Sequence, residues 1–128
     1  MLKKTITYTD YNDRVRTEDF YFNLSKAEIM DMEMSIEGGL TQMINKITAA
    51  QDYNALYKFF TNLIRKAYGE KSEDGKRFVK SEDISDSFTQ TEAYSVLLEE
   101  FTTDSKAAAE FVNAIIPKID NKKLEAAK

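Results

Sequence analysis

The chain contains no cysteine and no histidine. Without a thiol there is no cysteine nucleophile, no disulfide and no thiolate ligand, and without imidazole the usual proton shuttle near neutral pH is missing. The four glycines form neither a P-loop nor a dinucleotide-binding pattern, so the sequence has no glycine-rich cradle for phosphate. These absences exclude most familiar active sites, and we expect no cofactor and no metal site.

Long apolar runs are also absent. The N-terminal stretch MLKKTITYTD has two lysines but turns polar at once, without the apolar core of a secretory signal, and no later run is long enough to span a bilayer. Basic residues are outnumbered as well, because the chain has 18 Lys and Arg and 22 Asp and Glu. Nucleic-acid binding depends on clustered basic side chains, so this balance argues against a nucleic-acid partner. These absences predict a cytoplasmic protein whose partners are neither membranes nor nucleic acids.

What is present is the composition of a soluble globular domain. Hydrophobic residues make up 42% of the 128 residues, aromatic residues 12% and charged residues 31%. The aromatic residues supply bulk for a core. A chain of this length suits one domain with a single core.

The first part of the chain predicts an antiparallel β-hairpin over residues 3–24. In KTITYTDY, Ile6 and Tyr8 alternate with threonines, as in a half-buried strand. The segment VRTEDFYFNL places three large apolar side chains on one face of a second strand: Phe20, Phe22 and Leu24. Between the strands, Asn12 and Asp13 are of the non-glycine types that best tolerate positive φ, and they indicate a tight turn. We expect the apolar face of the hairpin to lie against helices.

The rest of the chain predicts a mostly helical body over residues 25–117. Ser25 and Glu28 have the spacing of a capping box, and Gly38-Gly39 supplies a left-handed end to the first helix. Apolar residues at helical spacing predict five later helices: one from Leu40 to about Ala50, one after Asp52 as far as Gly69, one from Ser81 through Phe88, one capped by Thr89 that carries Tyr94 to Phe101, and one after Asp104.

The remaining segments complete the expected organisation. Residues 70–76 read as a loop, and Phe78-Val79 as a short extended piece. Pro117 stops the last helix and is followed by a polar C-terminal tail over 118–128. The predicted fold class is α+β: an N-terminal antiparallel β-hairpin followed by a mostly α-helical bundle of about five or six helices, in a single domain over 1–117.

The segment EKSEDGKRFVKSE lies between two predicted helices and invites comparison with a calcium-binding loop. If Gly75 were the obligatory glycine of such a loop, Ser81 would stand where the bidentate glutamate must be, with Glu82 one residue late. The register therefore fails. We interpret the segment as a solvated loop with a turn at Asp74-Gly75.

Five segments carry a resemblance to a known family. They are KKTITYTDYN, TEDFYFNLSKAEIMDMEMS followed by EGGL, YGEKSEDGKRFVKS, FTQTEAYSVLLEEF and AAAEFVNAIIP. Together they resemble the tail assembly chaperones of long-tailed bacteriophages, over nearly the whole chain up to Pro117. The likeness is one of overall sequence rather than of a catalytic signature, so it indicates a role and no site. The hairpin turn departs from it in having Asn12-Asp13 where Asn-Gly is expected.

The resemblance implies a non-enzymatic chaperone that binds the long, aggregation-prone tape measure protein during tail assembly. It further implies a homo-oligomer that helps tail tube protein subunits to assemble, works in the host cytoplasm and is absent from the mature virion. A longer frameshifted product is common in such systems. Two rival classes are a minor structural protein of the phage tail and a hydrolase that uses carboxylates alone.

The helix after Ser25 carries two apolar sides. At about 100° per residue, Ala27, Met30 and Met34 fall on one side, and almost opposite lie Ile29, Met32 and Ile36. Either the helix is sandwiched between the hairpin and the bundle, or one stripe packs in the core while the other binds a client helix. On the second interpretation Ile29, Met32 and Ile36 are the protein-binding residues, with Met32 and Ile36 exposed.

Self-association has a candidate surface in the first strand. Two strands alone are marginal in water and need helix packing or pairing with a strand of another subunit. We expect Ile6, Thr7 and Tyr8 to pair with a second subunit.

Overall fold

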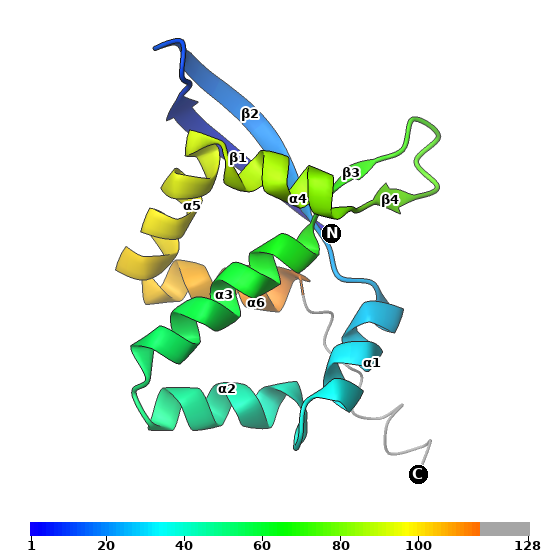
Figure 1. Cartoon of the computed structure of the whole chain (residues 1–128), viewed down its shortest axis with the longest axis vertical. Coiled ribbons are helices and arrows are strands. Elements are labelled where there is room, and N and C mark those ends of the chain that lie inside the picture. The colour runs from blue at the N-terminus through cyan, green and yellow to red at the C-terminus, as the bar shows by residue number, and fades with distance from the viewer. Residues whose placement is uncertain (116–128) are drawn as a thin grey trace.

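A computed structural model of the chain describes residues 1–115, apart from the side chains of Thr41, Ile44, Ile47, Thr48 and Ser105. Pro117 and the tail predicted over 118–128 lie outside the described residues. The described part is an antiparallel hairpin followed by a mostly helical body, which confirms the predicted α+β fold class. Figure 1 shows the hairpin turn at one end of the molecule and the helix α2 (Gly39–Ala49) near the other.

Within the described residues, one antiparallel sheet contains four strands in chain order: β1 (Leu2–Thr9), β2 (Val15–Phe22), β3 (Tyr68–Lys71) and β4 (Phe78–Val79). All eight residues of β1 pair with β2, with Leu2 opposite Phe22. The loop predicted over 70–76 is wrong at its start, because Glu70 and Lys71 pair with β4. The sequence YGEK gave no local signal for this strand, whose partners include the distant β2.

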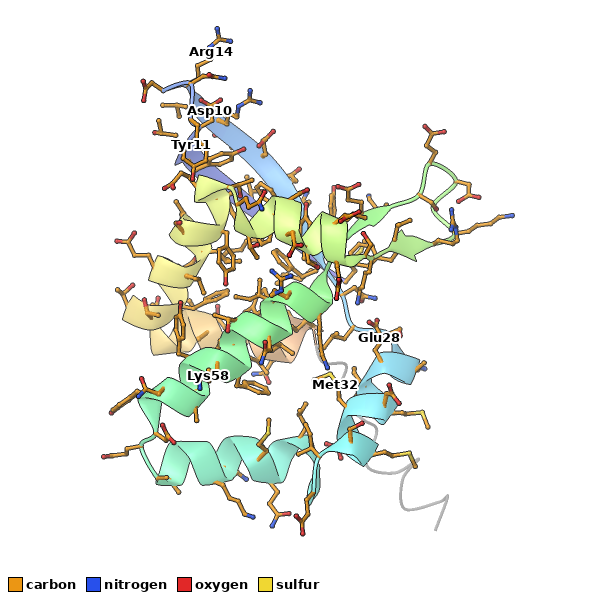
Figure 2. The ribbon with its side chains drawn as sticks, viewed as in Figure 1. Asp10, Tyr11, Arg14, Glu28, Met32 and Lys58 are labelled. Atoms are coloured by element: carbon orange, nitrogen blue, oxygen red, sulfur yellow. The ribbon has the colours of Figure 1, made fainter. Side chains whose placement is uncertain are left out.

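The hairpin turn is organised by Asp10. Its carboxylate accepts the backbone N–H groups of Asn12 (2.8 Å) and Arg14 (3.0 Å), and also the Nε–H of Arg16 (2.5 Å). These hydrogen bonds, the one from Arg16 above all, hold the pKa of Asp10 below its usual value. Asp13 takes a φ of 62°, the positive value predicted for a residue of this turn. Figure 2 shows Asp10 and Arg14 at the end of the hairpin.

Six helices lie within residues 1–115: α1 (Lys26–Ser35), α2 (Gly39–Ala49), α3 (Tyr53–Ala67), α4 (Glu82–Thr89), α5 (Glu92–Thr103) and α6 (Ser105–Ile115). Ser25, Asp52 and Ser81 precede α1, α3 and α4 as predicted, and each side chain accepts a backbone N–H of the first turn. The predicted cap of α5 is wrong, because Thr91 and not Thr89 caps it. Thr89 is instead the last residue of α4, and its hydroxyl donates to a carbonyl of that helix.

One hydrophobic core joins the hairpin to the helices. Phe22 is fully buried, and its ring lies 5.7 Å from that of Phe88 in α4 and 5.3 Å from that of Phe111 in α6, between centroids. Phe20 and Leu24 are also buried, which confirms the predicted inward face of the hairpin. In Figure 1, α4 and α5 lie beside the sheet, whereas α2 lies away from it and packs against α1 and α3.

Candidate protein-binding groove

An apolar groove lies among α1, α2 and α3. Its volume is about 320 Å³, and six of its lining side chains are apolar: Met32, Ile36, Met43, Ala55, Phe59 and Leu63. Asn62 and Lys66 of α3 also line it. Figure 2 shows Met32 on the side of α1 that faces α3. A concave, mostly apolar surface with few polar groups is suited to binding apolar side chains.

The α1 wall of the groove is fixed by polar contacts at the start of the helix. Lys80 Nζ donates to both carboxylate oxygens of Glu28 (2.8 Å each) and to the carbonyl of Asn23 (2.6 Å), and we call these contacts the α1 clasp. Ser25 and Glu28 also form the predicted capping box. Burial by itself raises the pKa of Glu28, but the hydrogen bonds from Lys80 and Ser25 outweigh it and lower that pKa. The clasp thus ties α1 to the residues that directly follow the strands β2 and β4.

The α2 wall is positioned by the chain reversal after α1. Gly38 and Gly39 adopt φ values of 81° and 85°, the left-handed conformation predicted for them, but the end of α1 itself is extended, with a φ of −107° at Ile36. A Cβ atom on Gly39 would lie 2.7 Å from a carboxylate oxygen of Glu33 and would push that carboxylate aside, whereas the positive φ favours glycine at this position. The Glu33 carboxylate accepts the backbone N–H of Leu40, whose side chain is buried. These contacts brace the corner between α1 and α2.

The third wall is α3, which is anchored at its C-terminal half. Leu63 and Ile64 are buried in the core. The guanidinium of Arg65 donates to Asp86 (2.5 Å) and to Thr89 (3.2 Å), both of α4. The groove-lining residues of α3 therefore belong to a helix held by contacts on its other faces.

The structure divides the predicted protein-binding residues between the core and the groove. Ile29 is buried in the core, with 3% of its surface exposed, while Met32 and Ile36 are half-buried and line the groove. The expectation that Met32 and Ile36 are the exposed pair was wrong, because Met30 (61% exposed) and Met34 (86% exposed) face away from the core. The staple formed by Leu24 buries Ile29, and Met32 and Ile36 follow on that same side of the helix.

The predicted self-association residues lie on the edge strand of the sheet. Ile6 is buried, and the half-buried Tyr8 donates its hydroxyl to the Glu18 carboxylate, a hydrogen bond that with burial raises the pKa of Tyr8. Thr7 is exposed, and its hydroxyl lies 3.0 Å from that of Thr17. Within the described residues, β1 pairs with β2 and has no strand on its other edge. A role of these three residues in self-association stays a prediction.

Sequence reasoning missed six groove residues: Met43, Ala55, Phe59, Asn62, Leu63 and Lys66. Met43 and Phe59 belong to apolar stripes that predicted their helices, but a stripe does not say whether its residues meet other helices or a partner. The clasp lysine, Lys80, was also missed, since it lies 52 residues from Glu28 and no local pattern joins the two.

The described part of the chain contains neither a metal-binding cluster nor a membrane-spanning helix. Residues 1–115 contain no group of three or more Asp and Glu side chains placed to hold a metal ion. None of the helices described there has the length and apolar character needed to cross a bilayer. The groove is therefore the candidate functional site within the described residues.

A family model described as phage tail assembly chaperone matches residues 1–127. The chain belongs to this family. The match covers the hairpin, all the described helices and the groove, and it confirms the resemblance inferred from the sequence. No curated protein and no solved structure is significantly similar to the chain. The groove thus belongs to a tail assembly chaperone.

Proposed function

We propose that this tail assembly chaperone binds the tape measure protein through the groove and keeps it soluble while tail tube protein subunits assemble around it. On this proposal the chain acts without catalysis, as a homo-oligomer in the host cytoplasm, and is left out of the mature virion. The apolar groove carries the proposal, because it offers half-buried Met32, Ile36 and Met43 to an apolar partner. Unbranched methionines adapt to varied apolar surfaces, as a chaperone of a long client requires.

The test is co-expression of the chaperone with the tape measure protein of the same phage. The double variant Met32→Lys/Ile36→Lys places two charges in the groove, and we expect soluble tape measure protein to fall at least about tenfold. Met30→Lys/Met34→Lys adds the same charges to the exposed side of the same helix, so it should leave solubilisation unchanged. Soluble, co-eluting tape measure protein with the groove variant at wild-type yield would refute the proposal.

Folding of the groove variant must be checked, because Met32 and Ile36 are half-buried. Circular dichroism and a cooperative thermal transition provide that check. A second variant, Asn62→Trp, fills the groove from an exposed position on α3 without removing a core side chain. We expect it to stay folded and to lose solubilisation as well.

The alternative function is that of a minor structural protein of the phage tail. Mass spectrometry of purified mature virions and of assembling tails separates the two. We expect the chain in assembling tails and not in mature virions, whereas a fixed copy number in the virion would favour the structural role.

A further inference from the structure

Positive charge collects in the segment that forms two of the three helices of the groove, although the chain as a whole is acidic. Residues 39–67, which form α2, α3 and their connection, contain four basic residues and one acidic residue: Lys46, Lys58, Arg65, Lys66 and Asp52. This segment has a net charge of +3 within a chain of net charge −4, so the other residues together carry −7. A charge asymmetry of this kind favours an anionic partner at the basic segment.

Most of these basic side chains form no ion pair within the described residues. Arg65 is paired with Asp86, but among the described residues Lys46, Lys58 and Lys66 form no ion pair. Lys66 lines the groove itself and is exposed. Figure 2 shows Lys58 on α3 as well, nearer the start of that helix.

The helix α1 carries net charge of the opposite sign. α1 and the two residues after it contain four acidic side chains and one basic side chain: Glu28, Asp31, Glu33, Glu37 and Lys26. Glu28 is occupied by the clasp and Glu33 by the N–H of Leu40, while Asp31 and Glu37 are exposed. None of these four carboxylates is among the described residues that line the groove, and the charged residue of that lining is Lys66.

We propose that the groove binds an amphipathic helix of the tape measure protein whose apolar stripe is bordered by carboxylates, and that these carboxylates pair with Lys66. This inference rests on the proposed function and names the class of client segment. The apolar lining provides the affinity, and Lys66 fixes the orientation, with the acidic border of the client along α3. A client helix with lysines at that border meets like charge at Lys66 and is rejected.

Three synthetic peptides of about 18 residues, long enough to form a helix, test the charge preference. They share one leucine and methionine stripe and differ in bordering it with Glu, Gln or Lys. By fluorescence anisotropy in 0.1 M salt, we expect the Glu peptide to bind at least about tenfold more tightly than the Lys peptide. In 1 M salt that ratio should shrink towards one, because the Debye length falls from about 10 Å to about 3 Å.

The variant Lys66→Glu tests whether the preference comes from the groove. It should abolish or reverse the preference for the Glu peptide while the Gln peptide binds as before. Lys76→Glu changes the net charge equally at an exposed position in the β3–β4 loop, away from the groove, and should keep the wild-type preference.

The possible results are distinguishable. Equal binding of all three peptides, no binding of any, or a preference that survives in Lys66→Glu would overturn the inference. If the peptides compete with the tape measure protein without a charge preference, the proposed function stands and the inference fails. If Lys66→Glu instead changes the oligomer mass in light scattering, a second copy of the chain occupies the groove, and the inference is again overturned.

Discussion

Removing the clasp lysine tests how the groove is held open. Lys80 Nζ is the donor that joins the Glu28 carboxylate to the Asn23 carbonyl, and its side chain is 21% exposed. The substitution Lys80→Met keeps an unbranched apolar stem and removes the ammonium group. It leaves the Asn23 carbonyl without this donor, and it leaves Glu28 with the backbone N–H of Ser25.

The structure sets the size of the effect. Hydrogen bonds to charged groups contribute about 1.5–3 kcal/mol each, but Glu28 is 39% exposed, and an exposed ion pair contributes only about 0.2–1 kcal/mol. We therefore expect a loss of about 1–2 kcal/mol in the free energy of unfolding. With an unfolding entropy of about 2.1 cal/mol/K per residue, this lowers the Tm of a 128-residue chain by about 4–7 °C.

The effect must depend on pH in a defined direction. The pKa of Glu28 is lower in the folded protein than in the unfolded chain, so its ion pair stabilises the fold above the unfolded pKa. That contribution is lost as the pH falls through the folded pKa. The difference in Tm between wild type and Lys80→Met should be full at pH 7 and should shrink below about pH 4.

Thermal denaturation followed by circular dichroism between pH 3 and pH 8 measures both quantities. Lys76→Met, at an exposed position without an ion pair among the described residues, is the matched control and should melt within about 1 °C of wild type. A Tm for Lys80→Met equal to that of the control would show that the clasp does not stabilise α1. A difference that persists unchanged at pH 3 would show that the ion pair with Glu28 is not the source of the stabilisation.

Two further predictions concern the ends of the domain. Thr7→Lys adds a charge at an exposed position of the edge strand and should lower the oligomer mass in light scattering without unfolding the monomer; an unchanged mass would exclude pairing through β1. Deleting residues 118–128, a polar segment after Pro117, should lower the Tm by no more than about 3 °C, and a larger drop in calorimetry would show that this segment contributes to the fold.

The features that sequence predicted correctly are those decided by neighbouring residues. The capping box of Ser25 and Glu28, the glycine reversal after α1 and the parity of Phe20 and Phe22 each depend on a few consecutive side chains. The strand β3 depends instead on pairing with β2, far away in the chain, and local sequence did not indicate it. Thr89 and Thr91 are equally good caps in isolation, and the end of α4 decides between them.

The groove was predicted only in part because it is formed by three helices rather than by one. The sequence identified the apolar side of α1 that contains Met32 and Ile36, but it assigned the wrong exposure to that side. Helical periodicity gives the angle between two stripes and not the direction in which either one faces. The staple between Leu24 and Ile29 was the local signal for that direction. Because Ile29 lies in the core, the stripe that continues from it faces the body of the protein.

The groove is more than a gap left by imperfect packing. Each wall is held by polar contacts outside the groove: α1 by the clasp, α2 by the bond from Leu40 to Glu33, and α3 by Arg65 and Asp86. These polar contacts support the walls in addition to the apolar packing of Met32 and Phe59 against the core. Cores fill small gaps at little cost, for example by exchanging an alanine such as Ala55 for a larger residue, and filling would gain stability. On the proposed function, a groove lined by methionines and held by separate braces suits a chaperone that binds a client and releases it.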